Sequence, residues 1–407
     1  MVSVGWKKSL IGDLATFSKG AGYSKKDLRV SGTPIVLYGR LYTNYELVIH
    51  KVNSYVEDKG GSIYSRGGEV VVPASGETAE DISRASVIAK PGVIIGGDLN
   101  VIYPNNAIIP ELLALLISNG TAKKRLSIKA QGKTVVHVQK NDLAGLEITY
   151  PEDPKEQERI VEAFSNIDTL IFQSEKLVEK YQEMKQGLLQ LLFPHAGQTK
   201  PEKSLSGFDK PWEEHRLGEI GNAKSGIGFP DSEQGGTVGI PFFKVSDMNT
   251  YGNENELLVA NNYVTEAQIS RNRWNVIEDV PAVFFAKVGA AVLLNRKRLV
   301  RRPFLLDNNT MAYVFDKKTW DCDFGKTLFE TIDLTKLTQI GALPSYNATD
   351  VEGLNVCIPE KAEQEVIGQF FMLLDNLIMR QQKKCEKYKM VKQGMVEELL
   401  TGKVRLV

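Results

Sequence analysis

The sequence is poor in cysteine and histidine, with only 3 and 4 of them in 407 residues. The cysteines Cys322, Cys357 and Cys385 are odd in number and far apart, so they predict neither a disulfide framework nor a zinc site. The histidines show neither the HxH nor the HxxxH spacing that would place two imidazoles on one face. We therefore expect that this chain binds no metal.

Long apolar runs and an excess of charge are also missing. No run approaches the roughly 18 apolar residues that span a bilayer, and the first residues lack the apolar core of a signal peptide. We expect a cytoplasmic protein. Lys plus Arg and Asp plus Glu number 50 each, so the formal net charge is 0. DNA-binding proteins are often more basic, and the balance is mild evidence against that class.

Signatures of catalysis are absent as well. The segment Ser127–Thr134 ends in Gly-Lys-Thr like a phosphate-binding loop, but Ser127 replaces the first glycine and a helical pattern precedes it. No serine or cysteine lies in a nucleophile-elbow pattern, and the Asn-Pro-Pro-aromatic tetrapeptide of amino-methyltransferases does not occur. We expect a binding protein without catalytic residues or a cofactor of its own.

What the sequence does contain is one long helical pattern that occurs twice. The first copy begins EQERIVEAFSNIDTLI, and its apolar residues recur at the seven-residue period of paired helices. The second copy lies at a constant offset and repeats even a tyrosine and a lysine of this stripe. The residues expected to pair the helices are Phe164, Ile167, Ile171, Tyr181 and Leu188 in the first copy and Phe371, Leu374, Ile378, Tyr388 and Met395 in the second.

The region before each helix is repeated too. The openings WKKSLIGDLATFSKGAG and WEEHRLGEIGNAKSGIG share their tryptophan and glycine positions, and short β-branched runs indicate strands after each. The glycine pairs, Gly20 with Gly22 and Gly226 with Gly228, resemble a dinucleotide loop, yet they lack its third glycine and are better explained by turns. Each globule closes on a matching phrase, NDLAGLEITYP or TDVEGLNVCIP.

These repeats predict an α+β fold with two similar α/β globules, each followed by a long helix. The predicted boundaries are a globule at 1–152, a helix at 153–195, a linker at 196–211, a second globule at 212–360 and a second helix at 361–402. A helix of this length extends ~60 Å. We expect the helices to pair as an antiparallel coiled coil with pseudo-twofold symmetry. The alternative is that each helix packs on its own globule.

A duplicated binder with two diverged readers suits a target with two different features, such as duplex DNA. The repeated order of tryptophan opening, strand-rich globule, closing phrase and long helix ending in Lys185–Gln190 or Leu399–Lys403 resembles the DNA specificity subunit of type I restriction-modification systems. The resemblance implies that each globule is a target recognition domain for one half of a bipartite, asymmetric DNA site. It implies that the paired helices set the gap.

The same resemblance implies partners. Two modification subunits, which bind S-adenosylmethionine and methylate adenine, would dock on this chain, and restriction subunits that use ATP would complete the nuclease. The chain itself would be a non-catalytic subunit.

Basic and polar residues in the variable loops are the candidates for DNA contact. In the first globule they are Lys19, Lys25, Arg40, Arg84, Lys129 and Lys133. In the second they are Lys224, Lys244, Arg296, Lys297, Arg298, Ser345 and Tyr346. Lysine contacts of this kind mostly go to phosphates.

Two other functions stay open at this point. One is a coiled-coil scaffold that joins protein partners without reading DNA, which fits the neutral charge. The other is an enzyme in its own right, against which the missing catalytic motifs argue.

Overall fold

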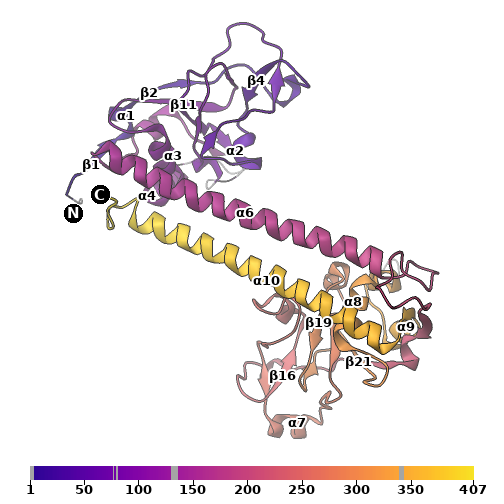
Figure 1. Cartoon of the computed structure of the whole chain (residues 1–407). Helices are drawn as coiled ribbons and strands as arrows, with labels where there is room; N and C mark the ends of the chain where they lie inside the picture. Colours follow the sequence, from indigo (N-terminus) through magenta and orange to yellow (C-terminus); the bar gives the residue numbers. More distant parts are fainter. Residues whose placement is uncertain (1–3, 77, 79–80, 130–135, 339–342) are drawn as a thin grey trace. The chain divides into compact units, whose positions relative to one another are not determined.

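The structure, a computed structural model, describes residues 4–76, 78, 81–129, 136–338 and 343–407. The chain divides into two compact units: unit 1 is Met1–Ser174 with Lys384–Val407, and unit 2 is Glu175–Lys383. Each unit contains one globule and one part of each long helix, α6 (Pro154–Leu192) and α10 (Lys361–Glu398) (Figure 1). In the part of the chain described, no helix is long and apolar enough to cross a membrane.

The first globule is built on a main sheet of five strands, and smaller sheets contain its other strands. Its strands are β1 (Trp6–Leu10), β2 (Ala15–Lys19), β3 (Leu28–Arg29), β4 (Thr33–Val36), β5 (Val48–Ile49), β6 (Tyr55–Val56), β7 (Glu69–Pro73), β8 (Ser75–Gly76), β9 (Ser86–Ile88), β10 (Ile94–Ile95), β11 (Leu99–Pro104), β12 (Val136–His137) and β13 (Glu147–Pro151). Its helices are α1 (Ile11–Leu14), α2 (Arg40–Thr43), α3 (Pro110–Ser118), α4 (Gly120–Lys129) and α5 (Lys140–Ala144), with 3-10 turns η1 (Lys25–Asp27) and η2 (Asp81–Ser83). The main sheet has the order β2-β11-β7-β9-β5, and a second sheet has the order β10-β4-β6-β3. Strand β1 pairs with β13, and β8 with β12.

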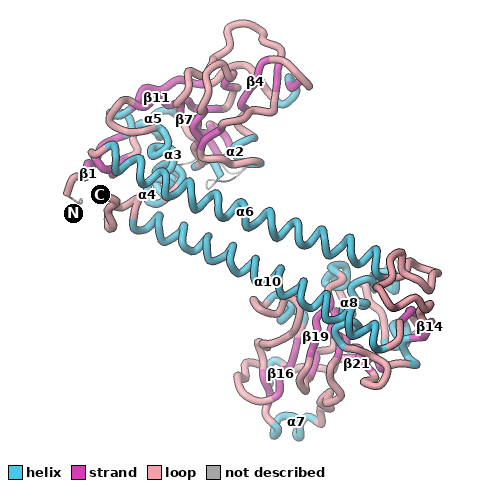
Figure 2. The backbone as a smooth tube through the Cα atoms, in the orientation of Figure 1, coloured by secondary structure: helices cyan, strands magenta, loops and turns pink. Residues whose placement is uncertain are grey.

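The second globule is built on a four-stranded sheet. Its strands are β14 (Glu213–Arg216), β15 (Gly221–Ser225), β16 (Ile240–Phe243), β17 (Tyr263–Val264), β18 (Ala282–Ala286), β19 (Lys297–Val300), β20 (Leu305–Leu306), β21 (Thr310–Phe315) and β22 (Asn355–Ile358). Its helices are α7 (Glu266–Asn272), α8 (Cys322–Thr331) and α9 (Ala348–Glu352), with 3-10 turns η3 (Leu217–Glu219), η4 (Asp231–Glu233), η5 (Val245–Asn249), η6 (Ala290–Leu294) and η7 (Leu334–Leu337). The main sheet has the order β15-β21-β18-β19, a second sheet β17-β16-β20, and β14 pairs with β22. The tube in Figure 2 shows the strands and helices of each globule.

The two globules share one topology. The order β15-β21-β18-β19 matches β2-β11-β7-β9, and the order β17-β16-β20 matches β6-β4-β10. In both second sheets the last pair is parallel, β16 with β20 and β4 with β10. The sequence repeat is therefore a repeat of the fold, since the matched strands are those whose buried β-branched and aromatic runs recur.

Within each unit the two long helices run antiparallel. In unit 1, Glu156 of α6 pairs with Arg405 just beyond α10, and Asp168 pairs with Lys392. In unit 2, Lys185 pairs with Asp375, and the ring of Phe193, just beyond α6, lies 5.9 Å from that of Phe371. In these contacts the residue numbers increase along α6 while they decrease along α10, as they do in antiparallel helices. The predicted α+β fold with antiparallel helices is confirmed.

The helices also pack on the globules, so the alternative from the sequence holds in part. In unit 1, Ile160 and Phe164 of α6 join Leu399 and Leu400 in one core with α3. In unit 2, Ile367 and Phe371 of α10 join Leu189 and Phe193 in a core with α8. The predicted pairing residues Phe164, Ile167, Phe371, Leu374 and Ile378 are buried, and Ile171, Tyr181, Leu188, Tyr388 and Met395 are half-buried. The apolar stripe of each long helix thus makes two contacts, one with the other long helix and one with a globule. The stripe is wide enough for both because it covers more of the helix surface than the helix pair alone buries.

Candidate nucleic-acid interface

Loops from distant parts of the second globule meet at the ends of its strands. We call residues 225–228, 244, 287–289, 307–309 and 344–346 loop cluster 2. Backbone hydrogen bonds hold it: Lys287 N–H donates to Asn309 O at 2.9 Å, and Tyr346 N–H to Lys287 O at 3.3 Å. Asp307 N–H donates to Phe243 O at 3.0 Å, which ties the cluster to β16. Side chains of these loops are therefore presented together.

A matching loop cluster 1 lies at the same place in the first globule. It consists of residues 19–21, 74–76, 96–98 and 136–138. Ala21 N–H donates to Ile95 O at 3.1 Å, Ala74 N–H to Asp98 O at 2.7 Å, and Val138 N–H to Ala74 O at 3.0 Å. Asp98 has a positive φ of 59°, a conformation that Asp tolerates better than most residues.

Two glycines make the close approach within these clusters. A Cβ at Gly226 would lie 1.7 Å from the carbonyl oxygen of Asp307, and one at Gly20 would lie 1.9 Å from that of Gly96. Any side chain at either position would force the two loops apart. These glycines come from the pairs seen in the sequence, and the structure explains them by backbone packing.

The charges of loop cluster 2 are unusual for a surface. Asp307 is only 5% exposed, and burial raises its pKa above the ordinary range. Burial also raises the pKa of Asp247, which accepts from the N–H groups of Lys244 and Asn261. Lys287 lies beside Asp307, and its own pKa is lowered by burial. Lys244 and Lys287 are thus charged neighbours of buried carboxylates, and the exposed residues 308 and 309, which carry amides, directly follow Asp307.

Lys287 was not among the residues predicted from the sequence. It directly follows β18 and lies two residues before Gly289, and that glycine's position after a strand is the signal that marks it.

The structure places the first-globule candidates apart from one another. Lys19 lies in loop cluster 1, and Lys25 is exposed in η1. Arg40 is already engaged, since its Nη2 donates to Glu46 and to the carbonyl of Lys51. Arg84 lies over the ring of Tyr45. Lys129 ends α4, and Lys133 lies outside the described residues.

Among the second-globule candidates, Lys244, Ser345 and Tyr346 come together in loop cluster 2. Lys224 is exposed on β15. Arg296 donates to Asn249 at 2.7 Å, and Arg298 donates to the carbonyl of Lys297.

Lys297 and Tyr346 are buried rather than exposed. The Lys297 ammonium donates to the carbonyl of Ile332 at 2.5 Å, and burial lowers its pKa to about 8. The Tyr346 hydroxyl donates to the carbonyl of Ala286 at 2.6 Å. Both side chains support the globule in this way, and DNA contact by either stays a prediction.

Four ionisable side chains, three of them buried and Glu330 half-buried, come together where α6, α8 and α10 meet in unit 2. They are Lys185, Lys326, Glu330 and Asp375. Each carboxylate is bridged by both ammonium groups, at 2.5 to 2.7 Å. In unit 1 the offset of the repeat leads to one ion pair, Asp168 with Lys392 at 2.5 Å.

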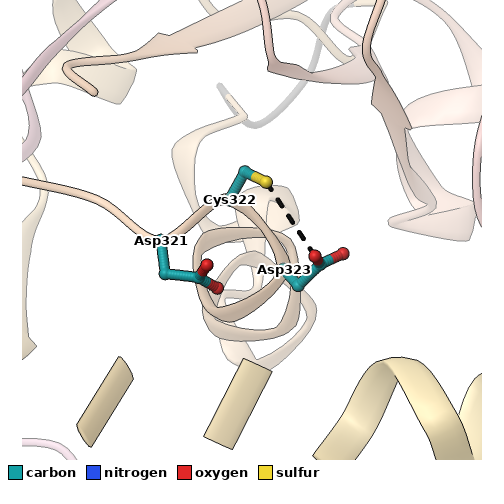
Figure 3. A group of neighbouring side chains, drawn as sticks. All are labelled: Asp321, Cys322 and Asp323. Carbon is teal, nitrogen blue, oxygen red and sulfur yellow. Dashed lines mark hydrogen bonds between the residues drawn. The ribbon is translucent and has the colours of Figure 1, made fainter. Parts of the chain in front are cut away.

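The start of α8 holds three neighbouring groups that a metal ion could use. Oxygen and sulfur atoms of Asp321, Cys322 and Asp323 lie within 4.8 Å of one another (Figure 3). Each already has a partner: Asp321 caps α8 by accepting from Phe324 N–H at 2.8 Å, and Arg301 binds both Cys322 and Asp323. These contacts give the trio a structural role.

Comparisons with known proteins agree on one family. The model of the "Type I restriction modification DNA specificity domain" matches residues 3–186 and again residues 209–386. The type I restriction enzyme MjaVIII specificity subunit of Methanocaldococcus jannaschii is 23% identical over 98% of this chain and 93% of its own.

Two solved structures share the fold. The S subunit of a type I restriction-modification system from M. genitalium has a TM-score of 0.64 at 15% identity, with 97% of this chain and 96% of that chain covered. A chain from a structural study of complex assembly and conformational transition of the type I R-M system has a TM-score of 0.56 at 15% identity, with 99% of this chain and 100% of that chain covered. Because the family model matches most of the chain in two copies, one in each globule, the chain belongs to the type I restriction modification DNA specificity family.

Proposed function

We propose that this chain is the specificity subunit of a type I restriction-modification complex, in which each globule reads one half of an asymmetric, bipartite DNA site. The observation that carries the proposal is the pair of equivalent loop clusters. Both clusters rest on the same backbone framework, because equivalent glycines, Gly20 and Gly226, allow the same close approach. Their exposed side chains differ, so two equivalent readers would recognise different bases.

The two clusters differ in their polar side chains. Cluster 1 carries the exposed Lys19, Asp98 and His137, whereas cluster 2 carries the half-buried Lys244 and Lys287 with the exposed amides of residues 308 and 309. Amide side chains read adenine and carboxylates accept from cytosine, while lysines bind phosphates or guanine. We therefore infer that the two half-sites differ in sequence and that neither cluster needs a strongly basic surface.

The partners follow from the same proposal. Two modification subunits with S-adenosylmethionine would dock on this chain and methylate adenine, and restriction subunits that use ATP would add cleavage. The chain would contribute recognition and no catalytic residue. A scaffold that joins proteins without reading DNA is not favoured, because the family is defined by a DNA specificity domain.

The test is to co-express the chain with its modification subunit in a host without DNA methylation and to map methylated adenines. One two-part asymmetric motif with a fixed gap is expected. Replacing residues 4–151 with the equivalent globule of another family member should change one half of the motif only. A complex that assembles but methylates no defined motif would refute the proposal.

A further inference from the structure

Two equivalent carboxylates lie near the starts of the two long helices. Glu156 of α6 is fully buried, and Glu363 of α10 is 3% exposed. Each is followed by a glutamine with an equivalent bond: Gln157 donates to the carbonyl of Pro151, the last residue of β13, and Gln364 to that of Pro359, just after β22, both at 2.9 Å. The two surroundings are therefore built alike, each within its own unit.

The carboxylate of Glu156 is paired with a guanidinium. Arg405 Nε donates to Glu156 Oε1 and Nη2 to Oε2, both at 2.6 Å, and the same arginine donates to the carbonyl of Val4. The indole N–H of Trp6 donates to Glu156 at 3.3 Å. Arg405 lowers the pKa of Glu156. The segment around Arg405 is held further by Arg159, which donates to the carbonyl of Leu406 at 2.9 Å.

The carboxylate of Glu363 has no such partner. Among the residues that the structure describes, no cation pairs with it, and burial raises its pKa. The indole N–H of Trp212, the equivalent of Trp6, is buried near it without reaching hydrogen-bond geometry. Three lysines line the same cavity. Lys210 pairs with Glu360 at 2.9 Å, Lys361 donates to the carbonyl of Lys317 at 2.7 Å, and Lys318, likewise a described residue, forms no ion pair with Glu363.

In unit 2, a cavity lies at the position equivalent to the one that Arg405 occupies in unit 1. Its volume is about 580 Å³, and Glu363 is part of its wall. Lys210 and Pro211 line it too, and by the sequence repeat they correspond to Val4 and Gly5, which Arg405 contacts in unit 1. At the position equivalent to Arg405 the chain has Gln198, which supplies no charge. An uncompensated buried carboxylate beside a polar cavity strongly favours a cation.

We propose that the cavity at Glu363 is a docking site for an arginine on an extended segment of a partner protein, held as Arg405 is held at Glu156. A guanidinium is favoured over an ammonium because its planar fork fits a carboxylate with two parallel hydrogen bonds. A second copy of this chain does not supply it, since its Arg405 is already bound to its own Glu156. The site adds a protein contact to the proposed reading of DNA and does not depend on it.

The probe is a labelled, N-acetylated peptide with the sequence of residues 399–407, whose arginine fits the equivalent seat in unit 1. It is titrated against the full chain by fluorescence anisotropy. We expect saturable binding that weakens roughly tenfold or more when citrulline replaces the arginine, because the charge-assisted pair is lost. This comparison uses the unmodified protein. Affinity should also fall as the pH falls through the raised pKa of Glu363, because only the ionised carboxylate pairs with arginine.

Matched variants locate the site. Glu363→Gln should weaken binding as much as citrulline does, with an unchanged circular dichroism spectrum. Glu156→Gln, the same change in the equivalent seat, should leave peptide affinity unchanged. The inference is overturned by any of three results: no saturation at millimolar peptide, equal affinity for Glu363→Gln, or a loss confined to Glu156→Gln, which would mean that the peptide replaces the chain's own segment in unit 1.

Discussion

The buried ionic cluster of unit 2 is a strong constraint on how α8 sits against the long helices. Lys326 and Glu330 belong to α8, whereas Lys185 and Asp375 belong to α6 and α10. Burial disfavours each charge by itself, and the attraction between neighbours opposes this, so that the pKa of Lys326 is raised and that of Glu330 is lowered. A shift of α8 by one turn would leave buried charges unpaired. The cluster therefore fixes the position of α8 along the long helices, in addition to stabilising their contact.

Removing one charge of the cluster should be more harmful than removing two. Lys326→Met leaves Glu330 and Asp375 to share Lys185, and we expect a loss of about 3–5 kcal/mol in the stability of unit 2. The double variant Lys326→Met with Glu330→Met keeps only the Lys185–Asp375 pair, the arrangement found in unit 1, and should recover most of that loss. Hydrogen exchange of α8 amides measures both. Equal destabilisation by the single and double variants would contradict this account.

The arginine at Glu156 makes the attachment of residues 399–407 dependent on pH. Hydrogen bonds from Arg405 lower the pKa of Glu156 from its ordinary 4.5. A carboxyl with a lowered folded-state pKa stabilises above its unfolded pKa, and that stabilisation is lost as the pH falls through the lowered value. We expect limited proteolysis at these residues to accelerate on acidification below about 4.5.

The variant Arg405→Gln should show that faster proteolysis already at neutral pH. Lys403→Gln, a change of an exposed neighbour, should behave as the unmodified chain does. Equal protection of Arg405→Gln and the unmodified chain at pH 7 would show that the ion pair does not hold the segment.

At the scale of elements, the turn after β15 decides how the loops of cluster 2 are presented. Gly226→Ala places a methyl group against the Asp307 carbonyl, and we expect a cost of about 1–3 kcal/mol together with a displaced loop. Gly228→Ala is the matched control, because nothing lies within 4 Å of a Cβ there. Hydrogen exchange at residues 305–310 and the second half of the methylation motif should change with the first variant only. An unchanged motif with Gly226→Ala would remove loop cluster 2 from recognition.

At the scale of the whole molecule, neither half of the chain contains a complete unit. Unit 1 joins residues 1–174 to 384–407, and unit 2 takes its part of α6 from the first half of the sequence. A protease site inserted between Ser206 and Gly207, both exposed, should therefore leave the two fragments bound to each other after cleavage. Gel filtration in native buffer is expected to show one species, which separates in urea. Two separate fragments in native buffer would contradict the division into units.

The sequence by itself was enough for the architecture. Phe164 and Phe371, at one offset, mark two helices of the same period, and the repeated turn and strand patterns around Gly20 and Gly226 mark two globules of one topology. Such patterns can be read from the sequence because helix and strand periodicity are local properties, set by which face of each element is buried.

The tertiary structure decided which charged groups meet and which are hidden. The basic run at residues 296–298 does not indicate that the ammonium of Lys297 is buried and donates to the carbonyl of Ile332. Nor does any sequence pattern indicate that Lys326 and Glu330 join Lys185 in one ionic cluster. The sequence repeat aligned Glu156 with Glu363, but only the folded chain shows that one meets Arg405 and the other meets a cavity. These differences depend on segments far apart in the sequence, whose packing fixes burial and pairing, and no local pattern encodes them.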